Sequence, residues 1–241
     1  ESGAPTRARQ MERPHSSPMS GARPEPRRIN NDPIADARKL AASANSMAEL
    51  RAIIDQFDGC PLKKAAKNTV VCDGAYDADV MIVGEAPGGE EDAQGLPFVG
   101  RAGKLLDKML ATIGLSRQEN VFITNLIYWR PPGNRDPSPA EMQICAPFLS
   151  RQIELKKPKL LLTAGKFATQ AMLGTDDGIM RLRGRKLLYR QEGLPAPVKC
   201  VPMLHPAYLL RRPEDKAKAW DDLRTIAALC DEMGIKRGAA L

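Results

Sequence analysis

The stretch Val80–Gly88 reads Val-Met-Ile-Val-Gly-Glu-Ala-Pro-Gly, and it decides the fold class. Its first four residues are apolar without a polar break, and a turn rich in glycine and proline follows them. An uninterrupted apolar run of this length is typical of a strand buried on both faces, as the strands of a parallel sheet are. The apolar residues between Leu105 and Ile113 recur with helical spacing. This part of the chain therefore indicates a strand–helix unit of an α/β fold.

Three further apolar runs follow, each with a helical pattern behind it. The runs cover residues 121–124, 159–163 and 198–203. The helices are expected from Ser138 onwards, over residues 166–173, and around Trp220–Cys230. Strands that alternate with helices in this way predict a parallel sheet covered on both faces.

Two short helices are expected ahead of the sheet, and a tail ahead of them. Asp32-Pro33 and Ser46–Glu49 have the residue pattern of helix starts, with a capping side chain at the first position. Residues 1–31 are rich in Pro, Ser, Gly and Arg and lack hydrophobic periodicity, which predicts a disordered basic tail. Such a tail is either a loose tether to a polyanion or a solvated segment without a role. We expect residues 32–241 to form a single domain.

The composition excludes several classes of protein. Of the 241 residues, 43% are hydrophobic and 27% are charged, which suffices for a buried core and argues against overall disorder. No run approaches the ~18 uncharged apolar residues of a membrane span, and the Arg-rich N-terminus lacks the apolar stretch of a secretory signal. The formal net charge of +7 fits a polyanionic partner. The five scattered cysteines are typical of reduced thiols, so we expect a cytoplasmic protein.

Polar side chains lie at the ends of three of the four expected strands. Glu85 follows the first strand, Asn125 ends the second, and His205 comes shortly after the fourth. Ligands of open parallel sheets bind at the carboxyl ends of the strands, so we expect these side chains to converge on one crevice. Taken singly, each has another explanation: Asn125 could cap a turn, and a lone histidine is more often structural than catalytic. Phe98, in the loop after the first strand, could likewise be a core aromatic.

Several motifs, taken together and in order, resemble those of the family 4 uracil-DNA glycosylases. They are Gly84-Glu85-Ala86-Pro87-Gly88, Pro97-Phe98-Val99-Gly100, Ile123-Thr124-Asn125, Arg130-Pro131-Pro132 with Asn134-Arg135, and His205-Pro206-Ala207-Tyr208-Leu209. The resemblance runs from about Cys60 to Arg212. It implies a three-layer α/β/α sandwich with a central four-stranded parallel sheet. It also implies that the partner is uracil-containing DNA, single- or double-stranded.

The resemblance further implies roles for the pocket residues. A glycosylase rotates the uridine out of the base stack, and Phe98 would stack against the flipped base. The side-chain amide of Asn125 would bind the uracil edge, since it offers both a donor and an acceptor. His205, as a neutral imidazole, would donate a hydrogen bond to uracil O2 while negative charge builds there. Glu85 would either hold a water molecule or stabilise the cationic sugar, and both roles stay open.

Three further residues complete the implied substrate pocket. Ala86 stands where the best-studied glycosylases of this fold carry an aspartate, so the general base of those enzymes is absent here. Gly88 replaces the bulky aromatic residue with which they exclude thymine. Glu91 would guard the 5-position of the base instead.

On the DNA side the resemblance implies an apolar wedge and phosphate contacts. Leu209 would enter the gap that the flipped base leaves in the stack. Arg211, Arg101 and Arg135 stand where they could contact phosphates.

The chain departs from the family at the ligands of an iron–sulfur cluster. Family members normally hold a [4Fe–4S] cluster through four cysteines, and only Cys60 and Cys145 stand at such positions here. Trp129 occupies one of the other two. The remaining one is Phe57 or, if Cys60 is the first cysteine of its pair, Lys63, although a cluster normally needs four thiolates. We therefore expect no cluster and no other metal or cofactor, with the two aromatic side chains filling the vacated volume. Cys60 and Cys145 would then be small buried hydrophobic residues.

The sequence thus predicts a monomeric, monofunctional uracil-DNA glycosylase that starts base-excision repair, with a possible action on other deaminated bases. No lysine stands in a pocket motif, which argues against a lyase activity. The alternative is a protein that binds, or covalently traps, uracil-containing or single-stranded DNA without turnover. Trapping relatives carry a histidine in an inserted basic loop, and the run from Arg130 to Pro139 contains none.

Overall fold

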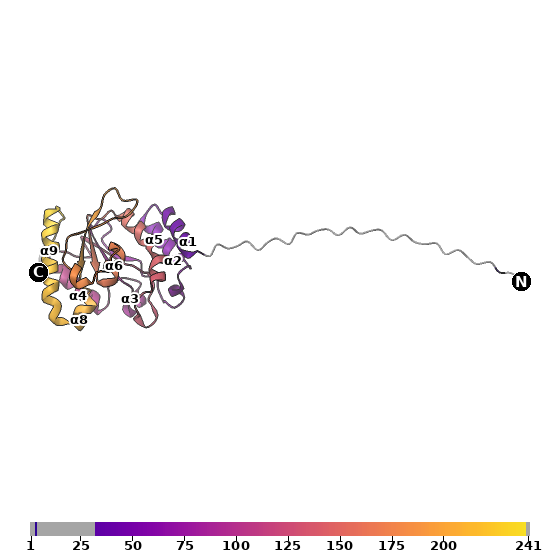
Figure 1. Cartoon of the computed structure of the whole chain (residues 1–241), viewed down its shortest axis with the longest axis horizontal. Helices are drawn as coiled ribbons and strands as arrows, with labels where there is room; N and C mark the ends of the chain where they lie inside the picture. The colour runs from indigo at the N-terminus through magenta and orange to yellow at the C-terminus, as the bar shows by residue number, and fades with distance from the viewer. Residues whose placement is uncertain (1–2, 4–31, 240–241) are drawn as a thin grey trace. The chain divides into compact units, whose positions relative to one another are not determined.

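The computed structural model describes residue 3 and residues 32–239 (Figure 1). The predicted tail, apart from residue 3, lies outside the described residues. The α-helices are α1 (Pro33–Ser43), α2 (Met47–Gln56), α3 (Gly89–Gln94), α4 (Arg101–Ala111), α5 (Pro139–Lys156), α6 (Lys166–Leu173), α7 (Ile179–Leu182), α8 (Pro206–Arg211) and α9 (Lys216–Glu232). Short 3-10 helices are η1 (Pro61–Lys64), η2 (Pro132–Asn134) and η3 (Pro213–Asp215). Within the described residues, no helix is both long enough and apolar enough to span a bilayer.

The strands are β1 (Cys72–Gly74), β2 (Val80–Gly84), β3 (Val121–Asn125), β4 (Leu160–Ala164), β5 (Leu187–Tyr189) and β6 (Val198–Met203). They form one sheet in the order β1-β3-β2-β4-β6-β5. The four central strands are parallel, as predicted. The prediction missed β1 and β5, which pair antiparallel with β3 and β6 at the two edges. Each edge strand has three residues, which is too short for a periodic pattern to appear in the sequence.

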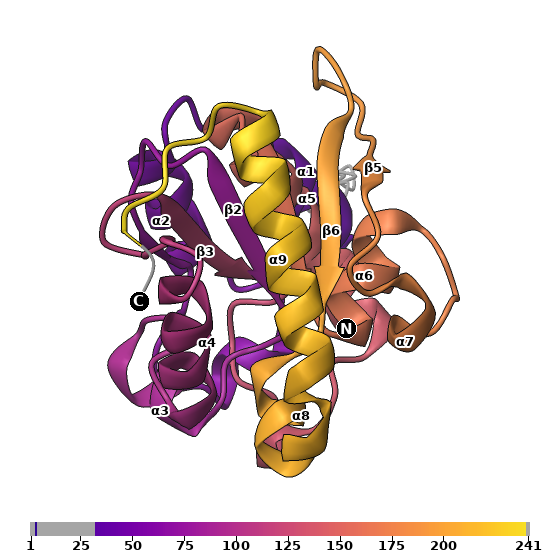
Figure 2. The same ribbon diagram turned by 90° about the vertical axis from the view of Figure 1, so that its left-hand side faces the viewer.

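Side chains of the central strands alternate between two apolar layers. Met81 and Val83 point into one layer, whereas Val80 and Ile82 point into the other. Helices α1, α2, α5 and α6 contribute to the first layer, and α4, α8 and α9 to the second. Figure 2 looks onto the second layer, with α9 and α4 in front of the strands and α1 and α5 behind them. The arrangement is the expected α/β/α sandwich.

The sheet has a topological switch point between β2 and β4. The chain leaves β2 through α3 and α4 towards β3, whereas it leaves β4 through α6 and α7 towards the opposite edge. Ligands of open α/β sheets bind at the carboxyl ends of strands that diverge in this way. The strand register places Gly84 beside Asn125, and Ala164 beside Met203, at that end of the sheet.

The predicted helix starts are confirmed by their capping hydrogen bonds. The carboxylate of Asp32 accepts from backbone N–H groups in the first turn of α1, and the Ser46 hydroxyl accepts from the N–H of Glu49 at the start of α2. Ser138 and Glu141 form a reciprocal capping box at the start of α5.

Candidate active site

A cavity of about 540 Å³ opens at the carboxyl ends of the central strands. Every residue predicted to touch the base lines it, and so do two of the three arginines predicted to contact phosphates. These residues are Glu85, Ala86, Gly88, Glu91, Phe98, Asn125, Arg135, His205 and Arg211. The strand ends therefore converge on one pocket, while the individual roles of these residues stay predictions.

Asn125 ends β3 with its side chain buried at the pocket. The residue is 1% exposed, and its Oδ1 atom has no hydrogen-bond partner among the described residues. A buried acceptor without a partner costs about 1–3 kcal/mol, so its position at a pocket indicates a ligand that donates to it. Gly84 makes room for this arrangement, since a Cβ atom there would lie 2.4 Å from Asn125 Oδ1 and 2.5 Å from the Phe98 ring.

His205 caps the start of α8 and faces Phe98. Its Nδ1 atom accepts a hydrogen bond from the backbone N–H of Ala207 at 3.1 Å, so the proton of the neutral ring is on Nε2. Burial, with a contribution from the Arg211 cation, lowers the pKa of His205 to about 4. The ring centroids of Phe98 and His205 are 5.5 Å apart, with an interplanar angle of 30°. The pocket therefore holds a neutral imidazole with one N–H left to donate, beside an aromatic ring.

Glu85 follows β2 and is half-buried in the pocket. Burial and the carboxylate of Asp136 raise the pKa of Glu85 to about 7, and the Arg211 cation opposes this rise. Asp136 also lines the pocket, and sequence reasoning missed it because it stands 11 residues after β3 ends and outside the quoted motifs. Glu85 therefore changes its charge near neutral pH, which is typical of groups at functional sites.

Glu91 borders the pocket with both carboxylate oxygens engaged. Its Oε2 accepts from the backbone N–H of Gly88 at 3.1 Å, and its Oε1 accepts from those of Val99 and Gly100 at 3.0 and 2.9 Å. The side chain thus joins the start of α3 to the loop that carries Phe98. A contact between Glu91 and the 5-position of the base stays a prediction. The structure shows that Glu91 also connects the start of α3 to the loop after Phe98.

The surroundings of Leu209 do not favour its predicted role as a wedge, which stays a prediction. Leu209 is 1% exposed and packs in the apolar layer beneath α8, whereas its neighbour Leu210 is 37% exposed. To enter a base stack, this side chain would have to leave the apolar layer. The motif alone did not reveal which of the two leucines the short helix turns inward.

The three arginines predicted to contact phosphates differ in their surroundings. Arg211 is exposed at the pocket. Arg135 also lines the pocket, but its guanidinium donates to both carboxylate oxygens of Glu141, at 2.9 and 2.6 Å. Arg101 is exposed at the first residue of α4, outside the pocket lining. Arg211 and Arg101 are therefore better placed to meet a phosphate than Arg135, whose charge is already paired.

Sequence reasoning missed the contribution of β4 and the segment after it. Gly165, Lys166 and Phe167 line the pocket, and so does Met180 of α7, which is 48% exposed. Gly165 has a φ of 93°, and a Cβ atom there would lie 3.0 Å from the Cβ of His205. A glycine directly after an apolar run was the available signal, since it marks a close approach of the backbone to another group.

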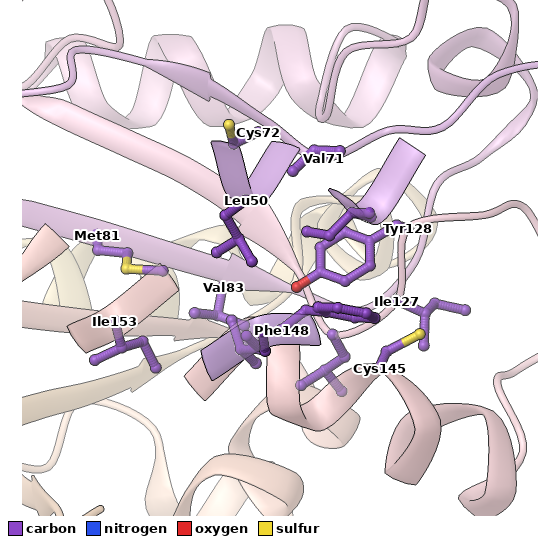
Figure 3. Close-up of a cluster of buried hydrophobic side chains, with 14 of the residues drawn as sticks. Leu50, Val71, Cys72, Met81, Val83, Ile127, Tyr128, Cys145, Phe148 and Ile153 are labelled. Carbon is purple, nitrogen blue, oxygen red and sulfur yellow. The ribbon is translucent and has the colours of Figure 1, made fainter. Parts of the chain in front are cut away.

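Packed aromatic side chains occupy the positions of the two missing cluster cysteines. Phe57 and Trp129 are 5% and 1% exposed, with their ring centroids 6.4 Å apart, and Phe57 packs edge-on against Phe148 at 5.0 Å. The neighbouring thiol of Cys145 lowers the pKa of Cys60. Figure 3 shows Cys145 and Phe148 among the surrounding apolar side chains.

These residues do not fit a [4Fe–4S] cluster. Two thiols are close together, but the other two positions present hydrocarbon surface, which cannot bind iron. Within residues 32–239, no group of three or more His, Cys, Asp or Glu side chains could hold a metal ion. All five cysteines are buried and free of disulfide bonds.

Comparisons of the sequence with known proteins identify its family. Residues 72–224 match the model of the uracil DNA glycosylase superfamily. The type-4 uracil-DNA glycosylase of Archaeoglobus fulgidus is 42% identical over 175 residues, which are 71% of this chain and 86% of the relative. That of Saccharolobus solfataricus is 41% identical, over 69% of this chain and 78% of the relative. That of Pyrobaculum aerophilum is 38% identical, over 73% of this chain and 91% of the relative. The chain therefore belongs to the uracil-DNA glycosylase superfamily, and within it to the type-4 family.

Proposed function

We propose that this chain hydrolyses the N-glycosidic bond of uracil in DNA and so starts base-excision repair. The observation that carries the proposal is Asn125 Oδ1, a buried acceptor without a partner in a pocket that the Phe98 and His205 rings also line. The edge of uracil offers the N3–H donor that this oxygen lacks, beside a carbonyl group for the amide N–H. The names of the curated relatives, type-4 uracil-DNA glycosylases, support the same activity.

In this reaction the bond between C1′ of the deoxyribose and N1 of uracil breaks, and its electron pair leaves with the base. Negative charge then builds on uracil O2, to which the Nε2–H of neutral His205 donates. A donor already oriented in a site with little water stabilises such charge more than solvent does. Water adds to C1′, and the proton that it loses passes through solvent to the uracil anion, so the products are free uracil and an abasic site.

Glu85 acts in its ionised form. A carboxylate in this position supports either the cationic sugar or the water that attacks it. Because the pKa of Glu85 is about 7, both of its forms are populated near neutral pH. The Arg211 cation faces the same pocket and favours the ionised form.

We also propose that the chain lacks lyase activity, although one ground for that expectation has changed. Lys166 lines the pocket, so a lysine is present after all. Its side chain is exposed, with Nζ 5.7 Å from the centroid of the Phe167 ring. A lyase would join a lysine amine to C1′ as a Schiff base, which borohydride reduces to a stable adduct. We expect no adduct when the reaction runs with borohydride present.

The aromatic packing around Phe57 and Trp129 supports a further part of the proposal, that activity requires no iron–sulfur cluster. The monomeric state and the cytoplasmic location stay predictions.

Release of uracil from an oligonucleotide with one uracil tests the proposal, in single-stranded and duplex form. We expect many turnovers per enzyme molecule. His205→Ala and Asn125→Ala should each lower kcat by about 10²–10³-fold, the usual loss when a transition-state hydrogen bond is removed. Asn45→Ala is the matched control, because Asn45 is an exposed asparagine outside the pocket lining, and it should keep the wild-type rate.

The other outcomes distinguish the alternatives. Tight binding of the oligonucleotide without release of uracil would indicate a binding protein, and a stable covalent complex would indicate a trapping one. Turnover that survives both pocket substitutions would contradict the roles given to Asn125 and His205.

A further inference from the structure

Phe98 has a backbone conformation that aromatic residues rarely adopt. Its φ is 54°, in the left-handed region that favours glycine. A residue in this region persists only where its surroundings hold it there, and such residues concentrate at functional sites. The contacts that hold the Phe98 turn therefore contribute to the position of the aromatic ring in the pocket.

Arg117 holds this turn from outside the pocket. Its Nη1 and Nη2 atoms donate to the carbonyl oxygens of Pro97 and Phe98, at 3.0 and 2.7 Å. Consecutive carbonyl groups of an extended chain point to opposite sides, so one guanidinium reaches both only where the chain turns. The forked guanidinium suits this arrangement, whereas the ammonium of a lysine, a point charge, does not.

Arg117 is itself fixed by two carboxylates. Asp73 accepts from Nη1 and Asp107 accepts from Nε, each at 2.9 Å. The arginine is 8% exposed and does not line the pocket. A buried cation is costly unless it is paired and hydrogen-bonded, and these four contacts use all three guanidinium nitrogens. The guanidinium therefore has little freedom to leave the Phe98 turn.

Two other groups enclose the same turn. Glu91 accepts from the backbone N–H groups of the two residues that follow Phe98. Gly103 of α4 lies so close that a Cβ atom there would be 1.8 Å from the Phe98 carbonyl oxygen. The carbonyl group is thus held between α4 and Arg117, while the ring of the same residue lies against Gly84 at the end of β2.

We propose that Arg117 is a positioning residue for the glycosylase reaction. Its guanidinium holds Phe98 in the left-handed conformation, and that conformation holds the aromatic ring where the flipped base stacks. Arg117 acts through Phe98 and touches neither the base nor the sugar. That the stacked base is uracil rests on the proposed function. That Arg117 orders the Phe98 turn rests only on the contacts of Arg117.

The test compares Arg117→Lys with Asp107→Asn in the full chain. The first variant keeps a positive charge but loses the paired hydrogen bonds to the carbonyl groups of Pro97 and Phe98. The second removes the charge of one ion pair, keeps an oxygen that can accept from Nε, and leaves both hydrogen bonds to the carbonyl groups in place. We expect Arg117→Lys to lower the single-turnover rate of uracil excision about 10–100-fold, as small misplacements of a reacting group do. Its Kd for the oligonucleotide should change less than about twofold, since phosphate contacts dominate DNA affinity. Asp107→Asn should leave both quantities near their wild-type values.

A second measurement does not depend on activity. Amide hydrogen exchange in a peptide covering residues 97–103 should be faster in Arg117→Lys and unchanged in Asp107→Asn. Equal exchange and equal rates in the two variants would overturn the inference. If the wild-type chain releases no uracil, the proposed function fails, and the exchange comparison still tests Arg117. If Arg117→Lys does not fold, Gly103→Ala takes its place, because the added methyl group displaces the Phe98 carbonyl from the side of α4. This variant should show the same lower excision rate and the same faster amide exchange in residues 97–103. Wild-type values of both would overturn the inference.

Discussion

Two pocket side chains have pKa values that move in opposite directions, and both shifts follow from burial. Burial disfavours the charged form of either group, so it lowers the pKa of His205 to about 4 and raises that of Glu85 to about 7. Between about pH 5 and 9 the imidazole therefore keeps one charge state while the carboxyl group titrates. A neutral donor beside a carboxylate is the combination that departure of a uracil anion from a sugar cation requires.

The rate of excision should depend on pH through Glu85. Because its ionised form is the active one, we expect kcat to fall about tenfold per pH unit below a midpoint near pH 7 and to level off above pH 8. Asp136→Asn removes the charge that raises the pKa of Glu85, so the midpoint should move to lower pH. Arg211→Gln removes the charge that lowers it, so the midpoint should move to higher pH. Single-turnover rates between pH 5 and 9 measure both shifts.

Glu85→Gln is the control for this dependence. An amide does not titrate in this range, so the variant should be slow and its rate should not vary around pH 7. A midpoint near pH 7 that persists in Glu85→Gln would assign the titration to another group.

The adjacent leucines of α8 provide a matched pair that tests the predicted wedge role of Leu209. Leu209 is buried and Leu210 is exposed. Leu209→Ala should therefore lower the free energy of unfolding by about 2–5 kcal/mol, as for other buried leucines, whereas Leu210→Ala should change it by less than about 0.5 kcal/mol. Urea denaturation of the two variants measures the difference. Equal stabilities, with slower excision only in Leu209→Ala, would support Leu209 as the wedge.

At the scale of secondary structure elements, the sequence predicted what long apolar patterns can reveal. The four central strands and the helices α4, α5, α6 and α9 have enough periodic residues to be identified. The edge strands β1 and β5 were missed because pairing with a neighbouring strand, rather than their own pattern, makes them strands. Likewise Asn125 and His205 were found because a polar residue ends or follows an apolar run. Gly165 was missed because it brings backbone, and no polar side chain, to the pocket.

Trp129 packs where α2, α5 and the loop after β3 meet. A second tryptophan, Trp220, serves as the control in a test of this packing. Trp129 is 1% exposed and its Nε1–H donates to Thr69 Oγ1 at 3.2 Å, whereas Trp220 of α9 is 46% exposed. We expect Trp129→Ala to cost about 3–5 kcal/mol of unfolding free energy and Trp220→Ala less than about 0.5 kcal/mol. Urea denaturation followed by far-UV circular dichroism measures both. A Trp129→Ala variant as stable as the wild type would show that the aromatic packing adds nothing.

At the scale of the whole molecule, the pocket and the packed aromatic residues lie at different parts of one sheet. Its carboxyl end holds the pocket, while the layer of α1, α2 and α5 holds the packed aromatic cluster around Phe57 and Trp129. The [4Fe–4S] cluster that the family resemblance implies would lie in the layer of α1, α2 and α5, where these aromatic side chains pack. The residues that line the pocket differ from those that replace two cluster cysteines, so we expect that excision does not depend on a cluster.

That separation predicts an active protein without iron. Protein purified under exclusion of oxygen should be colourless, contain less than about 0.1 iron per chain, and excise uracil at the same rate before and after treatment with an iron chelator. The physical reason is that Phe57 and Trp129 supply packed hydrocarbon where two thiolates would have to stand, so only Cys60 and Cys145 remain to bind iron. A type-4 relative with all four cysteines, purified alongside, is the positive control for iron loading. Brown protein with about four irons per chain would mean that other residues complete the ligand set and that the aromatic cluster rearranges to admit it.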